Sequence, residues 1–141
     1  MAAGWTPDDI ERIGSADELQ IAVRRADGTL RRWLSIWVVC VGDRVYVRTW
    51  YRRDTGWFGH VLQSHRACVR VPGLQADVVV TDVADGPDQR RAEIDAAYRA
   101  KYGRYGTSTV DNMVAPAAAA TTLLLTPEQG RTSADRRLSR V

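Results

Sequence analysis

The residues most able to do chemistry gather in one basic stretch near the middle of the chain. Arg48 and Thr49 end a valine-rich run, Arg52 and Arg53 follow closely, and Trp57 comes shortly after them. A phosphate group needs several converging donors, and guanidinium groups, a hydroxyl and the free N–H groups at a helix start supply them. The stretch therefore predicts a phosphate site at Arg48, Thr49, Arg52 and Arg53, with a solvated charged loop as the alternative.

Tryptophan is abundant, with five residues in a chain of 141. Trp37 and Trp57 lie in apolar runs and are expected in the core, whereas Trp33, Trp50 and Tyr51 lie near turns or loop ends. Aromatic side chains in such places line pockets for flat or hydrophobic ligands. A protein–protein interface would explain them equally well.

Two side chains are candidates for moving protons, His60 and Tyr51. His60 lies one turn into a predicted short helix, where an imidazole could face a pocket as an acid or base, with a structural histidine as the alternative. Tyr98 and Tyr102 are candidates for the wall of a substrate pocket, either as packing residues or as donors to a ligand. His60 and His65 do not share a helical face, so no metal site is predicted.

Composition favours an ordinary globular protein. The chain is 45% hydrophobic and 26% charged, with a net charge of +3, and no apolar run approaches the ~20 residues that span a bilayer. Its basic residues are scattered among acids, so we expect neither a nucleic-acid nor a membrane partner. The N-terminal segment lacks the features of a signal peptide, and Cys40 and Cys68 are expected to be free buried thiols, so a cytoplasmic location is predicted.

The first part of the chain is predicted to form a short helix and two strands. The helix starts at Pro7 and stops near Gly14. Alternating hydrophobicity predicts a half-buried strand over 19–23, and an Asp-Gly pair at 27–28 predicts a tight turn. The next strand is expected over 30–41, and its run IWVVCV is apolar on both faces, which predicts a central strand covered on both sides.

The rest of the chain adds four strands and two helices. They are predicted as a strand over 44–48, a helix over 57–66, strands over 67–71 and 74–83, a helix over 89–102 and a strand over 121–125. The total is six strands, two short helices and one longer helix, which predicts an α+β fold built on a small, mostly antiparallel β-barrel. Residues 1–126 are expected to form one domain, and 127–141 a disordered polar tail.

Six fragments in order resemble DUF2255, an uncharacterised bacterial family. They are WTPDDIERI, ADELQIA, RRADGTLRR, IWVVCVGDRVYVRT, IDAAYRAKYGRY and MVAPAAAATTLLLTP. The resemblance covers Trp5 to about Pro127. The chain departs from that family's pattern at Trp33, at Trp50 with Tyr51 and at His60, which would make the rim of a pocket more aromatic.

The order of elements is also similar to the wider FMN-binding split-barrel group, which includes deazaflavin-dependent nitroreductase-like proteins. In that group a hairpin strand ends in a small polar residue, and a glycine-bearing loop leads to an aromatic pair that opens a short helix. Thr49, Gly56 and Trp57 with Phe58 occupy those places. The resemblance implies a six-stranded split β-barrel and a homodimer with its cofactor at the subunit interface. That cofactor would be FMN or F420, its phosphate held by the basic stretch and its ring flanked by Trp57.

Three functional hypotheses follow. The first is a flavin- or deazaflavin-dependent oxidoreductase that acts on a small organic or natural-product substrate. The second is a cofactor-free cyclase- or isomerase-type enzyme of specialised metabolism that uses the barrel pocket. The third is a non-catalytic binding or assembly protein. FMN, F420 and no cofactor at all therefore stay open at this point.

Overall fold

Seven strands form one antiparallel sheet. The computed structural model describes residues 4–49 and 56–128 of the chain. The strands are β1 (Leu19–Val23), β2 (Leu34–Ile36), β3 (Val38–Val41), β4 (Arg44–Val47), β5 (Arg66–Val71), β6 (Leu74–Asp82) and β7 (Leu123–Pro127). Their order in the sheet is β2-β1-β5-β6-β7-β4-β3, and every neighbouring pair is antiparallel.

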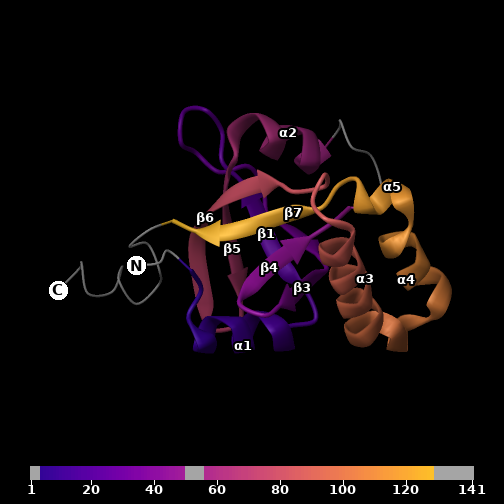
Figure 1. Cartoon of the computed structure of the whole chain (residues 1–141). Helices are drawn as coiled ribbons and strands as arrows, with labels where there is room; N and C mark the ends of the chain where they lie inside the picture. The colour runs from indigo at the N-terminus through magenta and orange to yellow at the C-terminus, as the bar shows by residue number, and fades with distance from the viewer. Residues whose placement is uncertain (1–3, 50–55, 129–141) are drawn as a thin grey trace.

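The sheet curls into a nearly closed barrel because its two edges belong to one stretch of chain (Figure 1). β2 pairs with β1 at one edge, β3 pairs with β4 at the other, and only Trp37 separates them. The single strand predicted over 30–41 is therefore two short strands that part at Trp37, which accounts for seven strands instead of six. The change of partner strand at Trp37 is called the bend. Its predicted central position is wrong, since both halves lie at edges.

Side chains that alternate along the strands fill the inside of the barrel, and two short helices close it. Helix α1 (Pro7–Ser15) lies below the strands and α2 (Gly56–Ser64) above them in Figure 1. Ile13 of α1 and Phe58 and Val61 of α2 pack into the same core as the inward-facing strand residues. Trp5 also belongs to this core, and its indole N–H donates to the carbonyl of Leu125 at 2.9 Å.

Helix α1 begins where the sequence predicts. The Thr6 hydroxyl accepts from the backbone N–H of Asp9 at 3.1 Å, and the Asp9 carboxylate accepts from the N–H of Thr6 at 3.2 Å. This reciprocal capping box satisfies two backbone donors that the helix start would otherwise leave free. It fixes where the helix enters the end of the barrel.

A second core lies on the outside of the sheet, where helices cover β3 and β4. Helix α3 (Asp88–Tyr102), the 3₁₀ turn η1 (Gly103–Tyr105), α4 (Thr107–Val114) and α5 (Pro116–Ala119) gather on that side (Figure 1). Val39 and Tyr46 of the strands pack on Ile94, Tyr98 and Tyr102 of α3. Helix α3 thus covers the outer apolar face of the run IWVVCV.

The predicted helix end at Gly103 differs slightly from the structure. Gly103 keeps right-handed helical geometry, and the chain continues through the 3₁₀ turn to Gly106. Gly106 has φ 108°, a conformation that glycine adopts readily, and it separates the turn from α4. No helix in the described part of the chain is long and apolar enough to cross a membrane.

Helix α3 also satisfies the open edge of β3. The Tyr102 hydroxyl accepts from the N–H of Val38 at 3.0 Å and lies 2.8 Å from the carbonyl of Asp17, to which it can donate. The Lys101 ammonium donates to the carbonyl of Val38 at 2.8 Å. Since no further strand pairs with this edge of β3, these side chains replace the missing ladder.

This arrangement predicts different effects for two neighbouring tyrosines. Tyr102→Phe removes the partner of the Val38 N–H and should lower the free energy of unfolding by about 1–3 kcal/mol. Tyr98→Phe is the matched control because both tyrosines are fully buried, and the Tyr98 hydroxyl makes no hydrogen bond within the described residues. Urea denaturation measures both variants. Equal loss of stability in the two would contradict the role assigned to the Tyr102 hydroxyl.

Candidate functional site

A hollow of about 470 Å³ lies beside Trp37. It lies where β2, the end of β4, the start of α2 and the end of α4 meet. Its lining residues are Glu18, Ser35, Ile36, Trp37, Arg48, Thr49, Trp57, Asn112 and Met113. This volume lies within the range of small-molecule sites, and the lining mixes aromatic with polar groups as such sites do.

Trp37 gives the hollow a fixed aromatic wall. Its indole stacks on the ring of Tyr102, with ring centroids 4.0 Å apart and planes 2° from parallel. Tyr105 lies against the same pair, with its centroid 5.9 Å from that of Trp37. Tyr102 is itself held by its hydrogen bonds to the bend, so the orientation of the indole is set from behind.

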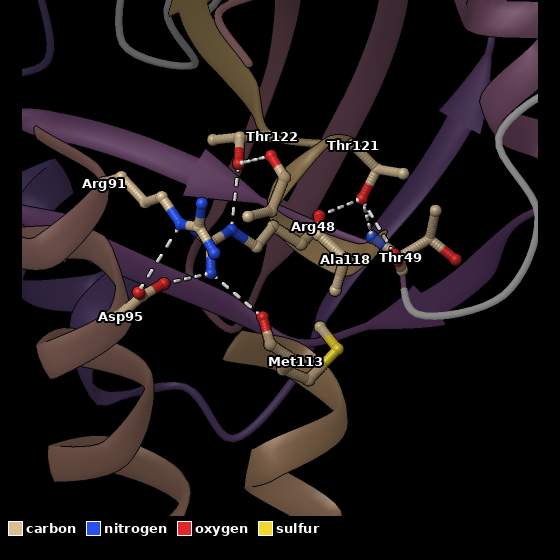
Figure 2. A network of polar contacts seen from close by, with 9 residues as sticks. Arg48, Thr49, Arg91, Asp95, Met113, Ala118, Thr121 and Thr122 are labelled. Atoms are coloured by element: carbon tan, nitrogen blue, oxygen red, sulfur yellow. Dashed lines mark hydrogen bonds and ion pairs between the residues drawn. The ribbon is translucent and has the colours of Figure 1, made fainter. Parts of the chain in front are cut away.

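Arg48 forms part of the wall, and a polar network holds its buried side chain (Figure 2). Its Nε donates to the Thr122 hydroxyl at 2.9 Å, and Nη1 donates to the Asp95 carboxylate at 2.6 Å and to the Met113 carbonyl at 2.9 Å. The Arg48 side chain has no exposed area, and that of Asp95 is 26% exposed. The guanidinium therefore joins the end of β4 to α3, α4 and the residue before β7.

This network leaves little of the guanidinium for a ligand. Nη2 is buried and has no hydrogen bond within the described residues, and the guanidinium carbon lies 5.5 Å from the centre of the Tyr98 ring. Arg91 approaches the other carboxylate oxygen of Asp95 at 3.8 Å. A structural role for Arg48 is thus visible, while its predicted phosphate role stays a prediction.

Thr121 holds the last residue of the hairpin in place. Its hydroxyl accepts from the N–H of Thr49 at 3.0 Å and lies 2.7 Å from the Thr49 carbonyl and 2.6 Å from the Ala118 carbonyl (Figure 2). The single hydroxyl proton serves one of these carbonyls at a time. Thr49 consequently lies at a fixed place on the wall of the hollow.

Burial sets the ionisation of the groups behind the wall. It raises the pKa of Tyr102 to about 12, raises that of Tyr98 as well, and lowers the pKa of Lys101 below its ordinary value. Burial also raises the pKa of Cys40 and of Cys68, so neither thiol is activated as a nucleophile. The raised pKa values of the two tyrosines keep their hydroxyls protonated at neutral pH.

The structure brings some predicted site residues together and separates others. Thr49 and Trp57 line the hollow beside Arg48. Trp57 and Trp37 are half-buried: each packs against one of the two cores, as expected, and each also lines the hollow. Trp50, Tyr51, Arg52 and Arg53 lie outside the described residues.

The other candidates lie away from the wall. Tyr98 and Tyr102 were expected in the wall of the pocket. Both have no exposed area, so they lie one layer behind the wall instead. His60 is half-buried on α2 and is not among the residues that line the hollow, so its proton-transfer role stays a prediction. Trp33 stacks under the guanidinium of Arg70, whose carbon lies 3.9 Å from the ring centre.

Besides Trp37, five lining residues were not predicted from the sequence. Glu18, Ser35 and Ile36 come from the β1–β2 edge, and Asn112 and Met113 from α4. Ser35 could have been predicted, because it lies two residues from both Trp33 and Trp37 and so shares their face of the strand. Nothing in the sequence around Asn112 pointed to a pocket. Within the described residues no group of three His, Cys, Asp or Glu side chains could hold a metal ion.

The sequence pattern of one protein family matches most of the chain. That family is described as "Uncharacterized protein conserved in bacteria (DUF2255)", and the match covers residues 9–125. No curated protein matches the chain.

Solved structures show the same fold at low sequence identity. HutZ, a heme storage protein from Vibrio cholerae, is 16% identical, with 89% of this chain and 91% of that chain covered and a TM-score of 0.63. A FAD-binding protein from Mesorhizobium loti is 11% identical, with 91% and 93% covered and a TM-score of 0.55. A pyridoxamine 5'-phosphate oxidase-related, FMN-binding protein from Nostoc punctiforme is 14% identical, with 89% and 83% covered and a TM-score of 0.52. These likenesses confirm the predicted split β-barrel.

The buried network makes a prediction about stability. Asp95→Ala leaves the Arg48 guanidinium buried without its carboxylate and should lower the free energy of unfolding by about 3–5 kcal/mol. Asp111→Ala is the control, since it breaks an exposed 3.0 Å ion pair with Arg99 and should cost at most about 1 kcal/mol. Thermal or urea denaturation compares the two. A loss of similar size in both variants would show that Arg48 does not depend on Asp95.

Proposed function

We propose that this chain, which belongs to the DUF2255 family, binds a small, flat organic cofactor of the flavin type in the hollow beside Trp37. The observation that carries the proposal is the indole of Trp37, held parallel to Tyr102 and facing a hollow of about 470 Å³. A planar ring stacks well on an aromatic side chain whose orientation is already fixed, because little freedom is then lost on binding.

The remaining lining residues fit such a ring. Trp57 offers a second aromatic surface from the start of α2, and Met113 offers an apolar one from α4. Asn112 brings a side-chain amide that can hydrogen bond to the carbonyl and N–H groups at the edge of a flavin or deazaflavin ring. When bound, such a ring supplies hydride or electron transfer, and the residues here bind and orient it.

The comparisons support the proposal at the level of the fold. The names of two neighbours describe FAD-binding and FMN-binding proteins, and a third describes a heme storage protein. All three names refer to planar, conjugated ligands, and they describe those proteins alone. A shared fold does not decide the ligand, so the wall residues of this chain itself, above all Trp37, support a flat ligand here.

The proposal extends to a reaction, to the residues that would carry it out and to an oligomeric state. With a flavin or deazaflavin bound, the protein acts as a cytoplasmic oxidoreductase on a small organic or natural-product substrate. His60 and Tyr51 are the proposed proton-transfer residues, and Arg52 and Arg53 the proposed additional phosphate ligands. We also propose a homodimer, which sedimentation velocity with and without FMN would detect.

Flavin titration tests the central proposal. Riboflavin, FMN and F420 are titrated into the protein, and binding is followed by polarisation of their own fluorescence. Trp37→Leu should raise the dissociation constant of the bound ligand by about tenfold or more because the stacking surface is lost. Gln63→Ala, an exposed change on α2, serves as the control and should leave it unchanged.

Two outcomes would contradict the proposal. Absence of binding of any of the three compounds to the wild-type protein would favour a cofactor-free enzyme or a binding protein. Binding that survives Trp37→Leu unchanged would place the ligand elsewhere on the molecule.

A further inference from the structure

A row of polar side chains crosses the outer face of the barrel next to the hollow. Ser35 of β2 is the direct partner of Gln20 of β1, and Gln20 is the direct partner of Arg70 of β5. Direct partners in neighbouring antiparallel strands point to the same face. Because strands lie about 4.8 Å apart, Arg70 is about 10 Å from Ser35 along this row.

A second hollow follows this row and adjoins the first. It has a volume of about 540 Å³, and Gln20 and Arg70 are among its lining residues. Glu18 and Ser35 line both hollows. A ligand with its ring at Trp37 can therefore continue past Glu18 and Ser35 toward Arg70.

The Arg70 guanidinium is held as a fixed donor at the far end of this path. Trp33 supports its flat face, with 3.9 Å between the guanidinium carbon and the ring centre, and its Nε donates to the Gln20 side-chain oxygen at 2.7 Å. Within the described residues, neither terminal amino group of Arg70 makes a hydrogen bond. An arginine fixed in this way presents two parallel donors that match a phosphate or carboxylate.

We propose that Arg70 binds the phosphate of a phosphorylated flavin whose ring lies at Trp37. This inference rests on the proposed function and identifies the ligand class of that site more closely. The ribityl chain, which carries several hydroxyls, crosses the shared wall, where the Glu18 carboxylate accepts and the Ser35 hydroxyl donates or accepts hydrogen bonds.

Two carboxylates, those of Asp17 and Glu18, line the second hollow together with Arg70. The Asp17 carboxylate is paired with Arg104, and Glu18 belongs to the wall that the second hollow shares with the first. Arg48, the other arginine near the ring site, already binds Asp95, Thr122 and the Met113 carbonyl. Nη2 of Arg48 has no partner within the described residues, but the Arg48 side chain has no exposed area. Arg70 is partly exposed, so among the described arginines that line either hollow it is the one that can present its terminal amino groups to an anion.

Paired titrations of riboflavin and FMN test the inference, since the two differ only in the phosphate. The wild-type protein should bind FMN about 10- to 100-fold more tightly than riboflavin, as expected for charge-assisted hydrogen bonds. Arg70→Gln, which keeps a flat polar group on Trp33, should remove that preference and change the riboflavin constant by less than about twofold. The control is Arg44→Ala, because Arg44 is an exposed strand arginine that lines neither hollow. This variant should keep the wild-type preference for FMN over riboflavin.

Each result separates the inference from the proposed function. Equal binding of FMN and riboflavin by the wild type, or an FMN preference that survives Arg70→Gln, overturns the role of Arg70 and leaves the ring site standing. Loss of the preference in Arg52→Ala and Arg53→Ala but not in Arg70→Gln assigns the phosphate to the basic stretch instead. If neither flavin binds, both the proposed function and this inference fail. Should Arg70→Gln not fold, raising the salt concentration must weaken wild-type binding of FMN but not of riboflavin.

Discussion

The bend at Trp37 is the constraint on which the rest of the structure depends. One stretch of chain forms both edges of the sheet, so the barrel closes only if β2 and β3 part at this residue. The bend leaves backbone groups of Val38 without a strand partner, and Tyr102 and Lys101 of α3 bind them. The same helix stacks Tyr102 on Trp37. Barrel closure, helix docking and the aromatic wall of the hollow are therefore consequences of one local geometry.

Arg48 fixes another part of the wall of the hollow, as Tyr102 fixes the indole of Trp37. Its guanidinium ties the end of the hairpin to α3, α4 and the segment before β7, and so fixes Met113 at the hollow, while Thr121 fixes Thr49 (Figure 2). A buried ion pair contributes little net stability, because desolvation offsets much of its attraction. Its value here lies in specificity: an arginine with three directional partners permits only one arrangement of four elements.

Much of the fold could be predicted from the sequence, because alternation, turn residues and capping residues are local signals. The start of α1 at Pro7, the Asp27–Gly28 turn and the helix α3 are confirmed. The bend at Trp37 could not be predicted, since an unbroken apolar run hides the point where a strand changes partners. Only part of the site could be predicted, because the partners of its residues lie far away in the sequence. Arginines signal charge but not whether a carboxylate such as Asp95, far along the chain, already binds them.

The most direct test of this account is a crystal structure of the protein soaked or grown with FMN. The account predicts flavin density in the hollow, with the ring parallel to the Trp37 indole on the side that Tyr102 leaves open, and the phosphate at Arg70. Flavin density at another surface, or a hollow in which Trp37 has turned to fill the space and no flavin binds, would contradict it.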